Sequence, residues 1–198
     1  MKYPEHVIML VNALRRLPGV GNKTAERYAF QMLEWKPDHL AELSQTVGTL
    51  HAKTRYCSDC GCLMDEEGCE FCVSDKRDGS TICVVSNIRE VFAIEQMGEY
   101  KGLYHVLGGL LSPMDGVTSE SLRVDELIRR AVNLTVKEVV IALDSTLEGD
   151  ATALYLKKAL SDCSVKITRL AFGIPMGSSL DYIDGGTLAY ALSGRTSI

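Results

Sequence analysis

Two pairs of closely spaced cysteines constrain this chain more than any other feature of its sequence. Cys57 and Cys60 form one C-x2-C pair, Cys69 and Cys72 form a second, and eight residues separate the two pairs. This spacing can bring four thiolates into one tetrahedron around a Zn²⁺ ion, at about 2.3 Å each. Because a closed shell of four thiolates leaves no open position for water, we expect one structural, non-catalytic zinc ion per chain.

A fifth thiol and a metal-free interpretation are the alternatives at this cluster. Cys62 lies between the two pairs and is a rival ligand. Buried or redox-active cysteines without metal would also explain the pattern, but two pairs so close together have few uses other than metal binding. Five of the seven cysteines fall within residues 57–72, which is typical of metal ligands in a reducing compartment rather than of a disulfide framework.

Composition excludes several broad classes of protein. The 198 residues allow one large domain or two small ones. A hydrophobic content of 46% with 24% charged residues is ordinary for a globular chain, so global disorder is excluded. No apolar run approaches the ~20 residues that span a bilayer, and the start of the chain lacks a signal-peptide pattern. We therefore expect a cytoplasmic protein without membrane contact.

The charge is unevenly distributed along the chain. The net charge is -5, yet residues 1–56 hold eight Lys and Arg against five Asp and Glu. The remaining residues hold 13 basic and 21 acidic side chains. A polyanionic partner is therefore expected to meet the N-terminal part.

Apolar residues recur at helical spacing in three stretches of the N-terminal part, which predicts three helices. The first helix ends at Pro18 and Gly19, the second begins at Asn22 with that residue as its N-cap, and the third follows Pro37. The N-terminal region is therefore predicted to be helical.

The glycine turn between the first two helices is a candidate phosphate site. The free N–H groups of the second helix suit a phosphate oxygen, and Lys23 and Arg27, four residues apart, share one helical face beside the turn. Together they predict a sequence-independent grip on a nucleic-acid backbone. An ordinary glycine turn with solvated charges is the alternative. A P-loop is excluded, because Asn22 separates Gly21 from Lys23.

From Thr81 onward the pattern alternates between strands and helices. The runs TICVVS, YHVL, EVVIAL and VKITRL predict β-strands, with helical stretches near 87–97, 121–134 and 151–162. Such alternation predicts a mostly parallel sheet covered on both faces, with ligands favoured at the carboxyl ends of the strands.

Acidic residues near those strand ends do not form a clear catalytic pattern. The first strand ends at Ser86, and the next acid, Glu90, lies one turn into a helix. We interpret Asp150 as a helix N-cap, and we keep Asp144 and Glu148 as candidates for a partner contact or a weak metal contact. A Mg²⁺ site for phosphoryl transfer would require several converging carboxylates.

Six features, in this order along the chain, show its similarity to a known family. The chain resembles the bacterial recombination mediator family RecR over essentially its whole length. The resemblance is carried by the helical glycine hairpin, the four-cysteine segment, TICVVS, EYKGLYHVLGGLLSPMDG, LEGDATALY and IDGGTLAYALSGR. The resemblance implies an α+β chain of several parts. These are a helix-hairpin-helix DNA-binding region over 1–56, a four-cysteine zinc finger over 57–72, an α/β Toprim domain over 80–175 and a Walker-B-like segment over 176–198 that contains Asp184.

The resemblance also implies a function. The family forms dimers or ring-shaped tetramers that bind DNA at gaps and at junctions of single and double strands. With RecO-like and RecF-like partners it helps to load RecA on gapped single-stranded DNA, in DNA repair by recombination. The zinc ligands then fall on the four paired cysteines and the DNA-facing cations on Lys23 and Arg27.

This sequence departs from the family pattern at three positions. Ser86 stands where the family usually has glutamate, Asp144 begins a segment that is usually Asn-Pro-Thr, and Cys62 stands where the family generally has no cysteine. We therefore expect a protein that is not an enzyme. The alternative from another class is a Mg²⁺-dependent Toprim nuclease or primase-like phosphoryl transferase that uses Glu90, Asp144 and Glu148.

Overall fold

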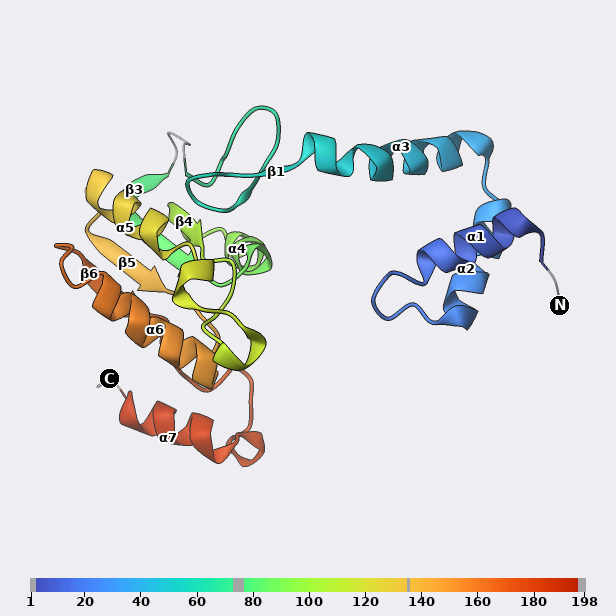
Figure 1. Ribbon diagram of the computed structural model, residues 1–198. Helices are drawn as coiled ribbons and strands as arrows, with labels where there is room; N and C mark the ends of the chain where they lie inside the picture. Colours follow the sequence, from blue (N-terminus) through green and yellow to red (C-terminus); the bar gives the residue numbers. More distant parts are fainter. Residues whose placement is uncertain (1–2, 73–76, 135, 196–198) are drawn as a thin grey trace. The chain divides into compact units, whose positions relative to one another are not determined.

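The computed structural model describes residues 3–72, 77–134 and 136–195 (Figure 1). The chain divides into two compact units, residues 1–53 and 54–198. Each unit has its own buried core.

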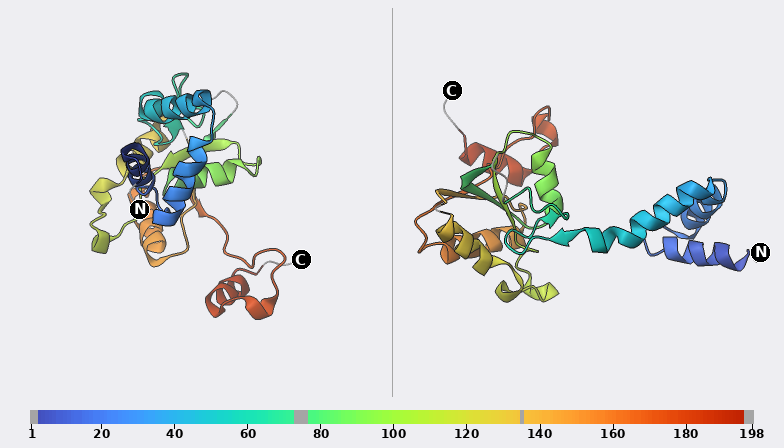
Figure 2. Two further views of the ribbon diagram at one scale, coloured as in Figure 1. Left: turned by 90° about the vertical axis from the view of Figure 1, so that its right-hand side faces the viewer. Right: turned by 90° about the horizontal axis from the view of Figure 1, so that it is seen from above.

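The first unit consists of three helices, as predicted: α1 (Glu5–Leu14), α2 (Asn22–Leu33) and α3 (Pro37–Lys53). Helices α1 and α2 lie side by side (Figures 1 and 2). Val7 and Val11 of α1 are buried with Ala25 and Ala29 of α2 in one apolar cluster. The two alanines are fully buried, and their small side chains allow the helix backbones to approach closely.

Two details of this unit differ from the sequence prediction. Gly21, not Asn22, is the N-cap of α2, and the Asn22 side chain instead donates a hydrogen bond to Glu26 Oε1 at 2.8 Å. The apolar stripe of α3 is not buried within the unit: Leu40, Leu43, Val47 and Leu50 are all exposed.

The second unit contains a four-stranded parallel sheet in the order β4-β3-β5-β6, which confirms the predicted parallel sheet. Its strands are β3 (Asp78–Val85), β4 (Gly102–Val106), β5 (Glu138–Ile141) and β6 (Lys166–Arg169). Its helices are α4 (Ile88–Glu95), α5 (Val124–Asn133), α6 (Leu147–Ala159) and α7 (Gly185–Ser193), with 3-10 turns at Pro113–Asp115, Ser119–Ser121 and Leu180–Tyr182.

Alternation along β3 divides the core of this unit into two layers. Ile82 and Val84 point into the layer that α5 and α6 cover. Cys83 and Val85 point into the other layer, with Val91 of α4 and the four-cysteine region of residues 57–72, called the cysteine segment from here on. Because successive strand residues face opposite sides, one apolar strand supplies both layers. The second view of Figure 2 shows α4 and α5 on opposite faces of the sheet.

Candidate metal centre and nucleic-acid interface

The four paired cysteines converge at a short hairpin. Strands β1 (Arg55–Tyr56) and β2 (Leu63–Met64) pair antiparallel on either side of the first C-x2-C pair, Cys57 and Cys60. Within it, the Cys57 amide donates to the Cys62 carbonyl at 2.8 Å, and Gly61 turns the chain with a φ of 74°. This conformation favours glycine because it lacks a Cβ atom.

The four sulfur atoms have the geometry of a single metal site. The Sγ atoms of Cys57, Cys60, Cys69 and Cys72 all lie within 4.8 Å of one another. The Cys57–Cys72 pair is 3.5 Å apart and the Cys60–Cys69 pair is 3.4 Å apart. A tetrahedron of sulfurs about 2.3 Å from a central ion has edges of about 3.8 Å. The arrangement therefore fits one four-coordinate ion, and it is the one metal-competent group within the described ranges.

Hydrogen bonds among the thiols separate their proton affinities. Contacts with the sulfurs of Cys62, Cys69 and Cys72 lower the pKa of Cys60 far below its usual range. The contact with Cys60 raises the pKa of Cys69 to about 12. These contacts favour the thiolate at Cys60 and the thiol at Cys69, and a bound metal ion would favour the thiolate at each of its ligands.

Cys62 lies beside the four-sulfur group without belonging to it. Its side chain is fully buried. The hydrogen bond to Cys60 raises the pKa of Cys62 most, burial raises it further, and the positive charge of Arg130 opposes the rise. The hydrogen bond and the burial therefore both favour the protonated thiol at Cys62, which can donate to the Cys60 sulfur.

The cysteine segment covers the outer edge of the sheet. The Val106 amide of β4 donates to the Cys60 carbonyl at 2.7 Å, and the Tyr104 amide donates to the Phe71 carbonyl at 3.3 Å. On the same edge, Arg77 donates to the Gly102 carbonyl at 3.0 Å. These bonds satisfy edge groups that would otherwise be open to another strand.

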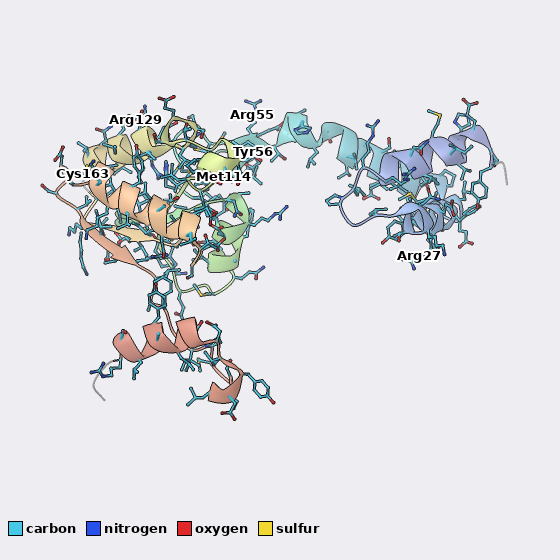
Figure 3. The ribbon with its side chains drawn as sticks, turned by 60° about the horizontal axis from the view of Figure 1, so that its bottom comes forward. Arg27, Arg55, Tyr56, Met114, Arg129 and Cys163 are labelled. Carbon is cyan, nitrogen blue, oxygen red and sulfur yellow. The ribbon has the colours of Figure 1, made fainter. Side chains whose placement is uncertain are left out.

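The turn between α1 and α2 exposes a group of cations. Gly19 has a φ of 77°, and α2 begins after Gly21 with no side chain capping its N–H groups. Lys23 and Arg27 are both exposed on the first two turns of α2, and Figure 3 shows Arg27 on the surface of its unit. Within the described ranges, neither side chain forms an ion pair.

Two further cations at this turn were missed by the sequence analysis. Arg15 and Arg16 follow α1 directly and are exposed. The signal was available, because the two arginines immediately precede the Leu-Pro-Gly turn in the sequence.

At the carboxyl end of β3, Glu90 acts in helix capping. Its carboxylate accepts bonds from the Ser86 amide at 2.7 Å and the Ser86 hydroxyl at 2.6 Å, and it completes a capping box with Asn87. The carboxylate is thus held in local structure.

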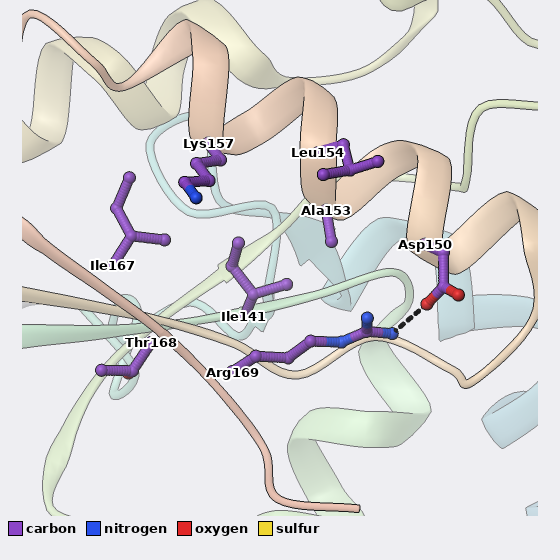
Figure 4. A pocket seen from close by; sticks show the side chains of 8 residues that line it. All are labelled: Ile141, Asp150, Ala153, Leu154, Lys157, Ile167, Thr168 and Arg169. Atoms are coloured by element: carbon purple, nitrogen blue, oxygen red, sulfur yellow. Dashed lines mark ion pairs between the residues drawn. The ribbon is translucent and has the colours of Figure 1, made fainter. Parts of the chain in front are cut away.

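The acids after β5 are dispersed. Asp144 and Glu148 are exposed, and they form no three-residue ligand group with other acids of the described chain. The prediction that Asp150 caps α6 is wrong: Thr146 is the N-cap, and its hydroxyl accepts from the Gly149 amide. Asp150 instead pairs with Arg169 at 2.7 Å (Figure 4).

This ion pair borders a cavity of about 370 Å³ between α6 and β6. Its other lining residues include Ile141, Ala153, Leu154 and Ile167, which make the cavity largely apolar (Figure 4). Two of the lining residues, Ile141 and Arg169, are the last residues of the parallel strands β5 and β6, and ligands of α/β sheets gather at such strand ends.

Asp184 and His105 are both held by hydrogen bonds within the fold. Asp184 is the N-cap of α7, and hydrogen bonds from the Thr187 amide and hydroxyl lower the pKa of its carboxyl. His105 of β4 is fully buried and hydrogen-bonded, and burial lowers its pKa to about 4.

Among the helices of the described residues, none combines the length and apolar character that crossing a bilayer requires.

Three family models match the chain in succession. "RecR, helix-hairpin-helix" matches residues 8–50, "Toprim domain" matches 80–171, and "RecR, C-terminal" matches 173–196. These matches and the four-cysteine group confirm the expected fold class.

Several curated relatives are similar over nearly their full length. The chain is 56% identical over 196 residues to "Recombination protein RecR" of Protochlamydia amoebophila, covering 99% of both chains. It is 47% identical over 195 residues to the protein of that name from Moorella thermoacetica, and 46% identical over 197 residues to that of Chlamydia caviae, covering 98% of each chain. Similarity at this level over the whole length shows that the chain belongs to the RecR family of recombination proteins.

Proposed function

We propose that this chain is a non-enzymatic, DNA-binding mediator of recombinational DNA repair. It acts with RecO-like and RecF-like proteins and promotes RecA loading on gapped single-stranded DNA. The hairpin of α1 and α2 supports this function most directly, because it presents uncapped helix N–H groups beside the exposed cations Lys23 and Arg27. Such a site binds phosphate oxygens without reading the bases.

Binding of gapped DNA by the wild-type protein tests this proposal. Each cation that neutralises a duplex phosphate gives a slope of about -0.9 in log affinity against log salt. With four cations per chain in contact, affinity should fall about 100-fold between 50 and 200 mM salt. Fluorescence anisotropy with a labelled gapped duplex measures this slope. Binding that is absent at 50 mM salt, or that is indifferent to salt, would contradict the proposal.

The four paired cysteines would hold one structural Zn²⁺ ion per chain. A zinc ion bound there would join the two C-x2-C pairs and fix the cysteine segment, which covers the β4 edge. Support comes from the sulfur separations and from the all-thiolate ligand set, which suits zinc and leaves no position for a substrate.

The rival Toprim nuclease or transferase is tested by incubating nicked, gapped and single-stranded DNA with Mg²⁺ or Mn²⁺. We expect no cleavage or synthesis, because Glu90 is engaged in capping and Asp144 and Glu148 are exposed and dispersed. Denaturing gel electrophoresis over several hours detects either product. Turnover that disappears in Asp144→Ala, while the fold is kept, would establish the enzyme instead.

The chain would work in the cytoplasm as a dimer or tetramer, with its parts divided at residues 1–56, 57–72, 80–175 and 176–198. Asp144 and Glu148 are exposed and remain candidates for contact with a partner protein.

A further inference from the structure

A buried arginine without an acidic partner lies near the cysteine segment. Arg130 of α5 is only 6% exposed, and it is the one buried charged side chain in the described parts of the chain. The ion pairs of those parts use other cations, namely Arg77, Arg123, Lys166 and Arg169. A cation removed from water is costly unless an anion compensates it.

The hydrogen-bond partners of Arg130 are neutral. Its Nη1 atom donates to the Tyr104 carbonyl at 2.7 Å and lies 3.2 Å from His105 Nδ1. His105 Nε2 is 2.7 Å from the Arg123 carbonyl, so the neutral ring donates there and accepts from Arg130. The second terminal nitrogen, Nη2, is buried and has no partner. Dipoles therefore surround this guanidinium, but no described carboxylate does.

The guanidinium is bonded to the edge that the cysteine segment covers. The amide and carbonyl of a strand residue point to the same side, so the Tyr104 carbonyl faces the same edge as its amide. That amide donates to Phe71, and two residues further along the Val106 amide donates to Cys60. Arg130 therefore reaches β4 between the two points where the cysteine segment is attached. Tyr104 and Val106 also share one apolar cluster with the paired cysteines.

We infer that Arg130 is the counter-charge of the four-thiolate centre, an inference that rests on the proposed zinc site. A Zn²⁺ ion with four thiolates has a net charge of about -2, and it would be the anion that this buried guanidinium otherwise lacks. Arg130 acts on the ligands as a positioning and charge-compensating residue, without ligating the metal. Metal binding and the packing of α5 against the β4 edge then stabilise each other.

Zinc release from full-length variants tests this inference. Arg130→Met removes the charge while keeping most of the volume, Arg130→Lys keeps the charge, and Arg129→Met removes an exposed charge from the same helix (Figure 3). Loss of a residue that supports metal ligands typically weakens metal binding 10- to 100-fold. We expect zinc transfer to a chromogenic chelator to be at least about tenfold faster in Arg130→Met, partly restored in Arg130→Lys and unchanged in Arg129→Met.

Thermal unfolding with and without zinc separates charge compensation from simple packing. If Arg130 compensates the thiolates, Arg130→Met lowers the melting temperature of the zinc-loaded protein more than that of the metal-free protein, in which no metal ion holds the four sulfurs as thiolates. Equal losses in both forms, or zinc release within twofold of wild type, would overturn the inference. If Arg130→Met does not fold, Arg130→Lys and Arg130→Gln are compared instead, and identical zinc release from these two would overturn it. The metal content of the wild-type protein tests the zinc site separately. If the wild type binds no zinc, the proposed zinc site is wrong, and the inference about Arg130 falls with it.

Discussion

Replacing Lys23 and Arg27 together by glutamate is expected to weaken DNA binding at least about 100-fold. At 0.1 M salt, each lost duplex-phosphate contact costs about eightfold in affinity through counterion release alone, or about 60-fold for two contacts. The two new carboxylates add repulsion. The salt slope should also become shallower by about 1.8 per chain, because two fewer counterions are released. Anisotropy with a labelled gapped duplex measures both quantities.

The fold should survive this double replacement. Both side chains are exposed, whereas the contact with α1 is made by Ala25 and Ala29. Glutamate in the first turn of a helix is also favoured by the helix dipole. Lys157→Glu with Lys158→Glu on α6 is the matched control, because it makes the same charge change at exposed positions of the other unit. Equal affinities of the hairpin variant and wild type would remove the hairpin from the DNA interface.

Removing the metal, or replacing Cys57 by alanine, is expected to destabilise the second unit strongly. Structural zinc supplies about 10 kcal/mol or more to small zinc-finger peptides. Even a third of that would lower the melting temperature of a chain of this size by about 10 °C. We also expect rapid proteolysis within residues 57–72, because the segment is held to β4 by few backbone bonds. Differential scanning calorimetry and limited digestion with a protease that cleaves after glutamate, which the segment contains at three positions, measure these effects.

Two other cysteines serve as controls for this experiment. Cys62→Ala should keep one zinc ion per chain, since Cys62 lies outside the four-sulfur group. Cys163→Ala alters a partly buried cysteine that packs against the other core layer (Figure 3). Loss of zinc in Cys62→Ala with retention in Cys57→Ala would show that the ligand set is misassigned. Metal content is measured by atomic emission.

Local spacing explains why some features were predictable from sequence. The four cysteines lie within 16 consecutive residues, so their convergence needs only a short hairpin. The strand β3 was visible as a run of β-branched residues, and the glycine turn was visible from its composition.

Long-range contacts explain most of what was missed. Arg130 bonds to Tyr104, which lies 26 residues away in the sequence. Asp150 of α6 forms an ion pair with Arg169 of β6. Neither contact has a periodic signal, because each depends on how α5 and α6 pack on the sheet. The α3 stripe shows the opposite case: a periodicity correctly predicted the helix, but it could not show what covers the apolar face.

Because the cysteine segment covers the β4 edge, the two edges of the four-stranded sheet are not equally open to pairing with another strand. With the β4 border already occupied, main-chain pairing with another molecule is restricted to the far border at β6, where no described strand is paired on the outer side. Two copies that joined there about a two-fold axis would each present an occupied border outward, so pairing through this sheet would not extend beyond two copies. By covering the β4 border, the cysteine segment therefore leaves no open border on that side for continued growth of the sheet.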